Sequence, residues 1–195
     1  MDSPTALKIA STVGIISTTT FWSMNLTINH LTFPTLLLGG LPKSSTSPAS
    51  LSSRFFVPST DESQVSKAFL NRQWQEMYWR GYSWGPLSGL LSAAAFMTAA
   101  YLADPESRQR YLYATASAAA VSVIPWTLAV MVPTNNELHR RGDAQRLAAD
   151  KEQVEESVGD GRDIMDLIRT WLVYNNVRAS LAVSATLAGV LASMQ

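Results

Sequence analysis

Residues 82–103, YSWGPLSGLLSAAAFMTAAYLA, contain no Asp, Glu, Lys, Arg or His. A helix needs about 20 mainly apolar residues to cross the hydrocarbon core of a bilayer, and this stretch is long enough. It is also rich in Gly, Ala and Ser, which would make a thin core in a soluble protein but allow helices in a membrane to pack closely. The stretch therefore predicts a transmembrane helix.

Three further stretches have the same character. They are residues 9–29, 111–136 and 171–194, and the only charged side chain among them is that of Arg178. We therefore predict an all-α integral membrane protein, a four-transmembrane-helix bundle formed as a single membrane domain over residues 1–195.

The first of these stretches is not expected to be a cleaved signal peptide. Only Lys8 precedes it as a basic residue, its apolar run is longer than that of a signal peptide, and no clear cleavage site of small residues follows. The apolar character continues to Leu38 after an expected break at Pro34. We interpret this segment as a retained helix.

Rows of small residues occur in two of the predicted spans. Gly81, Gly85 and Gly89 recur at intervals of four, as do Ala185, Gly189 and Ser193. Such rows let helix backbones approach closely. The glycine row could face a second copy of the chain, which makes a homo-oligomer plausible, or it could equally face a neighbouring helix of the same chain.

The loops differ in composition. The loop at 39–77 begins with a Ser/Pro-rich part, and residues 63–80 then have the pattern of an amphipathic helix leading into the second span. The charged loop at 137–170 includes a predicted surface helix over 138–158. Most Lys and Arg residues outside the spans fall in these two loops, so we expect both to be cytosolic, in a multi-pass protein of an endomembrane.

Composition excludes several kinds of site. The formal net charge is zero, which gives no indication of a nucleic-acid partner, and the chain has no cysteine. Its two histidines, His30 and His139, have no spacing typical of metal ligands, and the spans contain no carboxylate. No phosphate loop, dinucleotide fingerprint or nucleophile elbow is present. The sequence predicts neither a metal nor a cofactor.

Polar and aromatic residues gather at the predicted cytosolic end of all four spans. Buried polar groups in a membrane are costly without partners, so they mark candidate functional sites. Arg178 lies about two turns into the last span, too deep for a flanking residue. We expect these residues to form a pocket that binds a hydrophobic aromatic molecule. They are Asn25, Asn29, His30, Trp84, Trp126, Asn135, Asn136, Trp171, Tyr174, Asn175 and Arg178.

Several of these residues also have a purely structural interpretation. Asn25 and Asn29 lie four residues apart and could simply bond across helices, and His30 could be an interfacial residue. Arg178 could bind a backbone carbonyl, and the tryptophans could be interface anchors. His139, which follows the third span beside two arginines, is better interpreted as a solvated residue at a helix end.

The order of motifs resembles the DUF1772 membrane proteins, and most closely their fungal branch that contains the anthrone oxygenases of aromatic polyketide pathways. The resemblance covers nearly the whole chain, and its last two motifs are fairly specific for the family. The motifs are Arg72-Gln-Trp74 with Tyr78, Gly81 and Pro86, then Ile124-Pro-Trp-Thr127, Pro133-Thr-Asn-Asn-Glu-Leu138 and Trp171-x-x-Tyr-Asn175-x-x-Arg178.

The resemblance implies a monooxygenase of secondary-metabolite biosynthesis that oxidises an anthrone to an anthraquinone with molecular oxygen as co-substrate and no conventional cofactor. An anthrone CH2 is acidic for carbon because its conjugate base is an aromatic enolate. A general base, with donors to the enolate oxygen, would raise the population of this carbanion, which reacts with oxygen directly.

Roles follow for the candidate residues. We assign His30 as the base and Arg178, Asn135 and Asn175 as donors to the oxyanion. Trp84 and Trp171 would sandwich the tricycle, and the others would bind substrate. Some family members have a histidine where this chain has Asn175 or Asn176, which argues against a base on the last helix.

Two alternatives use other chemistry or none. A cyclase or isomerase acting on a hydrophobic intermediate would use the same pocket without oxygen. A membrane scaffold would hold soluble enzymes through the loop at 137–170 and would need no pocket. A transporter is disfavoured because no acidic residue lies within a span to couple protons.

Overall fold

A computed structural model describes residues 3–38, 67–82, 84–148 and 162–195. The elements in these residues are all helices, with no strand among them. Two of the helices are π-helical turns, labelled η. In chain order the elements are α1 (Ser3–Thr27), η1 (Ile28–Thr32), α2 (Phe33–Leu38), α3 (Lys67–Tyr82), α4 (Trp84–Leu102), α5 (Arg108–Trp126), η3 (Thr127–Met131), α6 (Val132–Ala148) and α7 (Ile164–Ser193).

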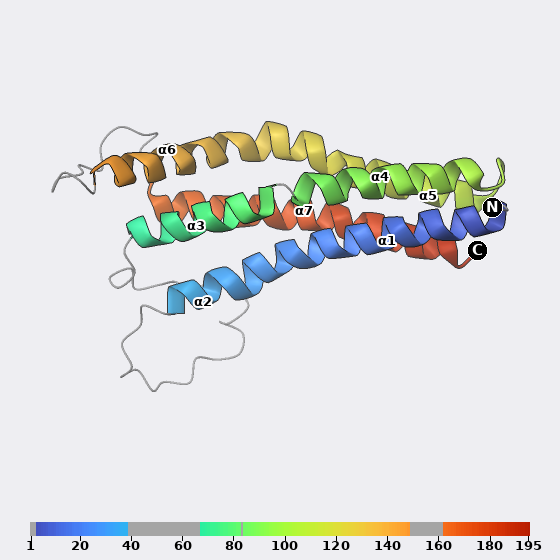
Figure 1. Ribbon diagram of the computed structural model, residues 1–195, viewed down its shortest axis with the longest axis horizontal. Helices are drawn as coiled ribbons and strands as arrows, with labels where there is room; N and C mark the ends of the chain where they lie inside the picture. The colour runs from blue at the N-terminus through green and yellow to red at the C-terminus, as the bar shows by residue number, and fades with distance from the viewer. Residues whose placement is uncertain (1–2, 39–66, 83, 149–161) are drawn as a thin grey trace.

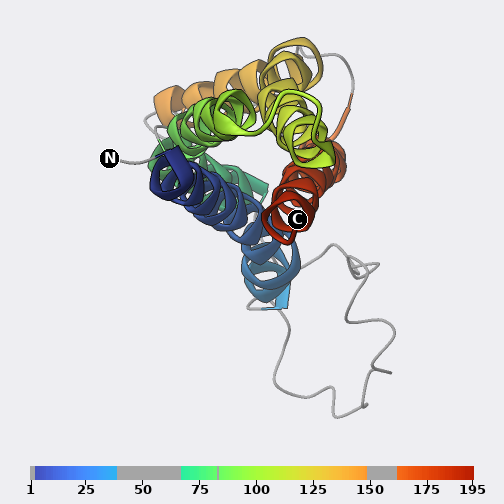
Figure 2. The ribbon, with the colours of Figure 1, turned by 90° about the vertical axis from the view of Figure 1, so that its right-hand side faces the viewer.

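These helices form four long rods. The first is α1–η1–α2, the second is α3 followed by α4, the third is α5–η3–α6, and α7 is the fourth (Figure 1). α1 packs against α4 and α7, and α5 packs against the same two helices, so the rods form a closed ring around a common axis (Figure 2). Both termini lie at one end with the α4–α5 turn, and α2, α3 and α6 lie at the other.

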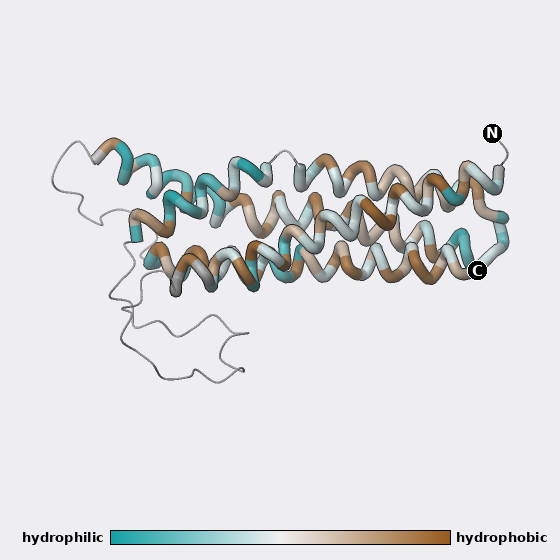
Figure 3. Tube along the Cα trace, turned by 60° about the horizontal axis from the view of Figure 1, so that its bottom comes forward, coloured by the Kyte–Doolittle hydropathy of each residue, from teal (hydrophilic) through white to brown (hydrophobic). Residues whose placement is uncertain are grey.

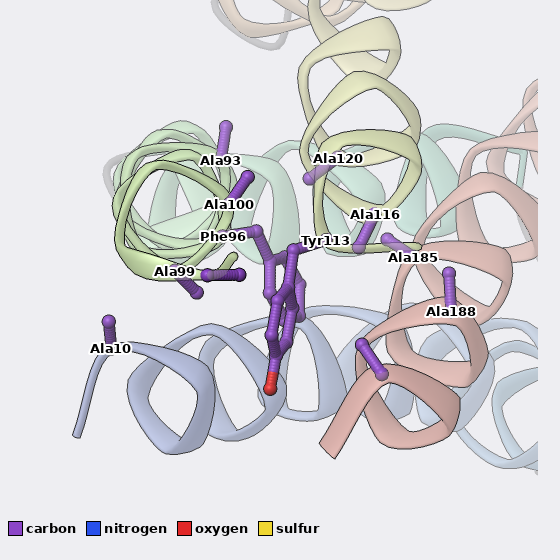
Figure 4. Packing of buried hydrophobic residues seen from close by; sticks show 12 residues of the cluster. Ala10, Ala93, Phe96, Ala99, Ala100, Tyr113, Ala116, Ala120, Ala185 and Ala188 are labelled. Atoms are coloured by element: carbon purple, nitrogen blue, oxygen red, sulfur yellow. The ribbon is translucent and has the colours of Figure 1, made fainter. Parts of the chain in front are cut away.

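The core at the end near the termini is made mainly of alanine. Two aromatic rings fill the space between the alanines: Phe96 and Tyr113 stack with their centroids 6.4 Å apart (Figure 4). Serine hydroxyls add hydrogen bonds between helices, from Ser92 to the carbonyl of Gly14 and from Ser117 to the carbonyl of Ala93. Small residues and hydroxyls are the usual means of helix association in a membrane.

Two glycines make room for Phe96. A Cβ on Gly189 would lie 2.5 Å from the Phe96 ring, and one on Gly14 would lie 2.6 Å from it. In the glycine row, Gly81 of α3 and Gly85 of α4 face α1: a Cβ on Gly81 would meet Met24, and one on Gly85 would meet Phe21, whereas one on Gly89 would meet nothing within 4 Å. The first two glycines of the row therefore lie toward a neighbouring helix of the same chain.

Prolines do not end the helices. The expected break at Pro34 is wrong, because the backbone stays helical from η1 through α2 to Leu38. Pro125 likewise lies inside α5 and is followed at once by the π-helical turn η3. A proline lacks an N–H and crowds the preceding turn. In both rods a turn with one extra residue lies beside the proline, and such turns often occur at functional sites.

The helix boundaries differ from the sequence prediction in two loops. The predicted amphipathic helix before the second span is confirmed as α3. The third rod continues without interruption past residue 136 to Ala148, where we expected a loop followed by a surface helix, and α7 begins at Ile164, ahead of the predicted start at 171. The Ser/Pro-rich segment at 39–62 and the rest of the predicted surface helix at 149–158 lie outside the described residues.

Within the described residues, two helical stretches are long and apolar enough to cross a membrane, Lys67–Leu102 and Arg108–Leu147. α1 and α7 do not belong to this set. They contain many Ser, Thr and Asn residues, and α7 also contains Arg178. Hydrophobic residues follow the rods along most of their length, and hydrophilic residues collect near the ends (Figure 3).

We predict that Gly189→Ala destabilises the protein while Gly89→Ala does not. The new methyl group at 189 would overlap the Phe96 ring, whereas a Cβ on Gly89 meets nothing within 4 Å. Overpacking of this kind costs about 1–3 kcal/mol. The apparent melting temperature in detergent should therefore fall for Gly189→Ala and stay constant or rise slightly for Gly89→Ala. Equal melting temperatures would contradict the packing around Phe96.

Candidate functional site

A network of asparagine side chains joins α1 to α7. Asn175 donates to Asn29 Oδ1 over 2.8 Å and to the carbonyl of Asn25 over 3.3 Å. Asn29 in turn donates to Asn176 Oδ1 over 2.6 Å and to the carbonyl of Leu172 over 2.9 Å. Asn25, Asn29 and Asn175 are all buried. Each amide therefore has partners on the opposite helix, as buried polar groups require.

Arg178 is the charged member of this network. Its Nη2 donates to Asn25 Oδ1 and Asn175 Oδ1, each over 2.6 Å. The guanidinium carbon lies 5.4 Å from the centre of the Phe21 ring, in the range of a cation–π contact. Two amide oxygens and a ring thus hold the cation in place, and none of them carries a negative charge. These contacts therefore do not neutralise the positive charge of the guanidinium, which can act on a ligand.

A cavity of about 100 Å3 lies beside Arg178. Its lining comes from all four rods, and both π-helical turns contribute to it. Most of the lining is apolar, with several methionines among the side chains. The lining residues are Met24, Ile28, Met77, Tyr78, Gly81, Tyr82, Gly85, Pro86, Thr127, Met131, Asn135, Trp171 and Arg178.

Three lining residues have buried polar atoms without a hydrogen-bond partner in the described part of the chain. They are Arg178 Nε, Trp171 Nε1 and Asn135 Oδ1. Leaving such groups unpaired costs about 1–3 kcal/mol each. Two of them are donors and one is an acceptor, so a ligand with an electron-rich oxygen and a hydroxyl group would match this set.

Tyr78 is one of three lining residues that carry a hydroxyl group, with Tyr82 and Thr127. The Tyr78 hydroxyl is hydrogen-bonded to the Asn135 side chain and is close enough to Arg178 for the two to interact electrostatically. Its ring lies among other aromatic rings, with centroids 5.2 Å from Trp74 and 4.6 Å from His139. Packing on these rings fixes the position of the Tyr78 side chain on α3.

The structure brings together some of the predicted site residues. Arg178, Asn135 and Trp171 line the cavity. Asn25, Asn29 and Asn175 lie in the network that holds Arg178 and do not line the cavity.

The other predicted residues lie elsewhere. The indole nitrogen of Trp126 donates to the carbonyl of Tyr174 over 3.2 Å, and the two rings are in contact. His30, Trp84 and Asn136 are exposed, and none of the three lines the cavity.

Sequence reasoning missed several lining residues, above all Tyr78. It was quoted in the motifs of the resemblance but received no role. A usable signal was its spacing, because Trp74, Tyr78 and Tyr82 recur every four residues and so share one face of a helix. Thr127 and Met131 were harder to find, because they lie in the π-helical turn after Pro125.

No group of three or more His, Asp or Glu residues that could hold a metal is found in the described residues. His139 is surrounded by rings, with centroids of Trp74 and Trp79 at 4.9 and 5.2 Å, and its Nε2 is buried without a partner in the described chain. His139 contacts the ring of Tyr78 and does not itself line the cavity.

Comparison with known proteins identifies the family. The model of the family described as "Anthrone oxygenase" matches residues 74–188. The chain belongs to the anthrone oxygenase family. This confirms the resemblance seen in the sequence motifs. The matched region of this anthrone oxygenase family member runs from α3 to α7 and so contains every cavity-lining residue except Met24 and Ile28 of the first rod.

Curated relatives agree with this assignment at low identity. The chain is 27% identical to a protein named "Monooxygenase hypC" from Dothistroma septosporum, over 70% of each chain. It is 26% identical to "Anthrone oxygenase encC" from Aspergillus fumigatus, over 67% of this chain and 73% of the relative. A third relative, "Anthrone oxygenase ptaC" from Pestalotiopsis fici, is 24% identical over 59% of this chain and 78% of its own. No solved structure matches.

We predict that Asn175→Ala destabilises this anthrone oxygenase family member and that Asn136→Ala does not. The first change removes the donor to Asn29 Oδ1 and an acceptor of Arg178, whereas Asn136 is exposed. Removing one partner from a buried polar pair costs about 1–3 kcal/mol. Thermal unfolding in detergent measures both variants. Equal melting temperatures would show that the amide network does not hold α1 to α7.

Proposed function

We propose that this protein is a membrane-bound oxygenase of a fungal secondary-metabolite pathway that oxidises an anthrone-type aromatic with molecular oxygen. The single observation that carries the proposal is the position of Arg178. Uncharged amides hold its guanidinium at the wall of an otherwise apolar cavity, with Tyr78, Asn135 and Trp171 around it. Family membership and the names of the relatives support the reaction class.

All four rods cross the membrane in this proposal, and the end with α2, α3 and α6 faces the cytosol of an endomembrane. The outward faces support it, because many large apolar side chains on the rods are exposed, more than a soluble monomer usually tolerates. Examples from each rod are Ile16, Leu90, Val121 and Leu187. The basic residues at the α3–α6 end support the orientation.

The reaction begins with loss of a proton from the CH2 group of the anthrone. The electron pair delocalises onto the carbonyl oxygen and makes it an enolate oxygen. Arg178 and the indole N–H of Trp171 are placed to donate to this oxygen in a cavity with little other polar surface. Fixed donors at a site of developing charge are the largest single contribution in many enzymes.

Oxygen then reacts at the carbanion. A new C–O bond forms, the carbanion is oxidised, and the oxygen molecule is reduced to a peroxide that takes up a proton. The O–O bond breaks as the remaining C–H proton leaves, which gives the quinone carbonyl and one molecule of water. The CH2 group loses four electrons and the oxygen molecule gains four, so the step balances without another reductant.

Tyr78 is the proposed proton-transfer group. The sequence analysis gave this role to His30, whose side chain is exposed and lies outside the cavity lining. Tyr78 borders the cavity, and its hydroxyl is close enough to Arg178 for the two to interact electrostatically. A positioned acid–base group contributes about 100-fold or more to the rate.

Binding of a tricycle requires the cavity to widen. Pockets for molecules of that size usually measure about 300–1,000 Å3, and this cavity measures about 100 Å3. Met24, Met77 and Met131 are the side chains best able to move, because methionine is unbranched and adapts to irregular shapes. The proposal therefore expects these methionines to change rotamer when substrate binds.

We predict that membranes containing this protein consume oxygen when supplied with a hydroxylated anthrone, and that Arg178→Met reduces the rate about 100-fold, as for loss of an oxyanion donor. Oxygen uptake and quinone absorbance are followed together against membranes without the protein, since anthrones oxidise spontaneously. Arg169→Met is the matched control, because Arg169 lies on the same helix, pairs with Asp166 over 3.6 Å and does not line the cavity.

Three outcomes would change this account. Substrate conversion without oxygen uptake would favour a cyclase or isomerase. Oxygen uptake that a chelator abolishes would mean that a metal takes part. Equal rates for Arg178→Met and Arg169→Met would remove Arg178 from the chemistry.

We also predict that Tyr78→Phe lowers the oxidation rate about 100-fold while His30→Ala leaves it unchanged. The phenylalanine keeps the ring that packs on Trp74 and His139 and removes only the hydroxyl. Tyr101→Phe serves as the control, because Tyr101 is 80% exposed at the other end of α4. A large loss with His30→Ala and none with Tyr78→Phe would return the role of base to the histidine.

A further inference from the structure

A second and larger hollow opens beside the cavity. It measures about 640 Å3 and runs between the first rod and α3 at the end that carries α2 and α6. We call it the side groove. The wall on the first rod is mainly apolar, with Met24, Ile28 and Leu36 beside one threonine, Thr32, and the wall on α3 carries charged residues.

The side groove and the cavity share part of their lining. Met24, Ile28, Met77 and Gly81 border both. Three of these are flexible or aliphatic side chains, and the fourth has no side chain. A Cβ on Gly81 would meet only the end of Met24, at 3.9 Å. The boundary between the two hollows is therefore thin and easily moved.

The charged wall consists of Arg72, Glu76 and Arg80, which follow one face of α3 at intervals of four. Arg80 and Glu76 approach within 3.9 Å, and all three residues are exposed. Two cations against one anion leave this wall net positive. A planar ligand with an acidic edge could lie with its rings on the apolar wall and its oxygens toward the arginines.

We infer that the side groove is the route by which a flat aromatic molecule with an acidic hydroxyl or carboxyl edge enters the cavity from the cytosolic face of the membrane. The inference rests on the proposed function and adds to it the path and the charge of the substrate. Arg72 and Arg80 select the ligand at the mouth, and the passage past Gly81 delivers it to Arg178.

The absence of cysteine from the chain permits a direct test. A single Gly81→Cys is labelled with a small maleimide, with and without dihydroxyanthraquinone as an unreactive ligand. At about ten times the half-saturating ligand concentration the labelling rate should fall about tenfold, in proportion to the free fraction. Ala144→Cys is the control, because Ala144 is exposed on α6 and borders neither hollow. Its labelling rate should not change.

The charged wall is tested in the same assay. The protein that carries Arg72→Gln and Arg80→Gln in addition to Gly81→Cys is compared with the single Gly81→Cys variant. It should need about ten times more of an anthraquinone carboxylate for half-protection, as expected for the loss of two exposed ion pairs. The concentration of unsubstituted anthraquinone needed for half-protection should stay the same. Equal effects on both ligands would show that the arginines do not recognise charge.

The passage itself is tested by turnover. Gly81→Leu should lower kcat/KM for the anthrone about tenfold by filling the boundary between the two hollows. Gly89→Ala is the control and should retain kcat/KM, because Gly89 lines neither hollow and a Cβ there meets nothing within 4 Å. Retention of full kcat/KM by Gly81→Leu would overturn the route.

These measurements separate the two proposals. Protection of Gly81→Cys in a protein that never consumes oxygen would keep the route and reject the oxygenase. Normal oxygen uptake without protection would keep the oxygenase and reject the route. The labelling rate could instead differ between phosphatidylserine and phosphatidylcholine vesicles and not change with added anthraquinone. That result would show that a lipid occupies the groove and would also overturn the route.

Discussion

The hydrogen bonds from Arg178 to Asn25 and Asn175 are the contacts on which the site depends. A cation within a helix bundle needs partners, and an acidic partner would cancel its charge. Amide oxygens satisfy the guanidinium and leave the charge in place. The same amides bind α1 to α7, so the contact that positions the cation also closes the ring of rods. The same residues therefore contribute to the stability of the bundle and to the proposed chemistry.

The two ends of the bundle differ for a physical reason. Near the termini the helices approach closely, because the core consists mainly of Ala, with only the rings of Phe96 and Tyr113 between the helices. At the α3–α6 end the side chains are large, with Trp74, Trp171 and Phe33 in the core. Two π-helical turns lie at the transition and contribute Ile28, Thr127 and Met131 to the cavity. The tightly packed end near the termini thus forms a rigid frame for the cavity at the α3–α6 end.

Much of this arrangement could be predicted from the sequence. Charge-free stretches and rows of small residues predicted long helices, and the polar residues at one end predicted the depth of the site. Arg178, Asn135 and Trp171, which line the cavity, were among the predicted residues because their chemistry is unusual at that depth. The family motifs predicted the reaction class.

The sequence could not show which side chains share a cavity. A histidine is the usual base, so the role was given to His30 and none to Tyr78, but the direction of each side chain depends on the phase of its helix. η1 and η3 each insert an extra residue and so turn the face that follows, and no simple 3.6-residue count predicts that. Pro34 was expected to end a helix, yet η1 lets the chain continue past it. The exposure of His30 and the burial of Asn29, its neighbour in η1, follow from this local geometry.

We propose that Arg178 stabilises an anionic oxygen in the cavity. The most direct test is the ionisation of a bound dihydroxyanthraquinone, followed by its change in visible absorbance as pH is raised. A fixed guanidinium favours the anion, so the ligand bound to the wild-type protein should ionise at a lower pH than the ligand bound to Arg178→Met. Ionisation at the same pH in both proteins, with both shown to bind the ligand, would contradict the account.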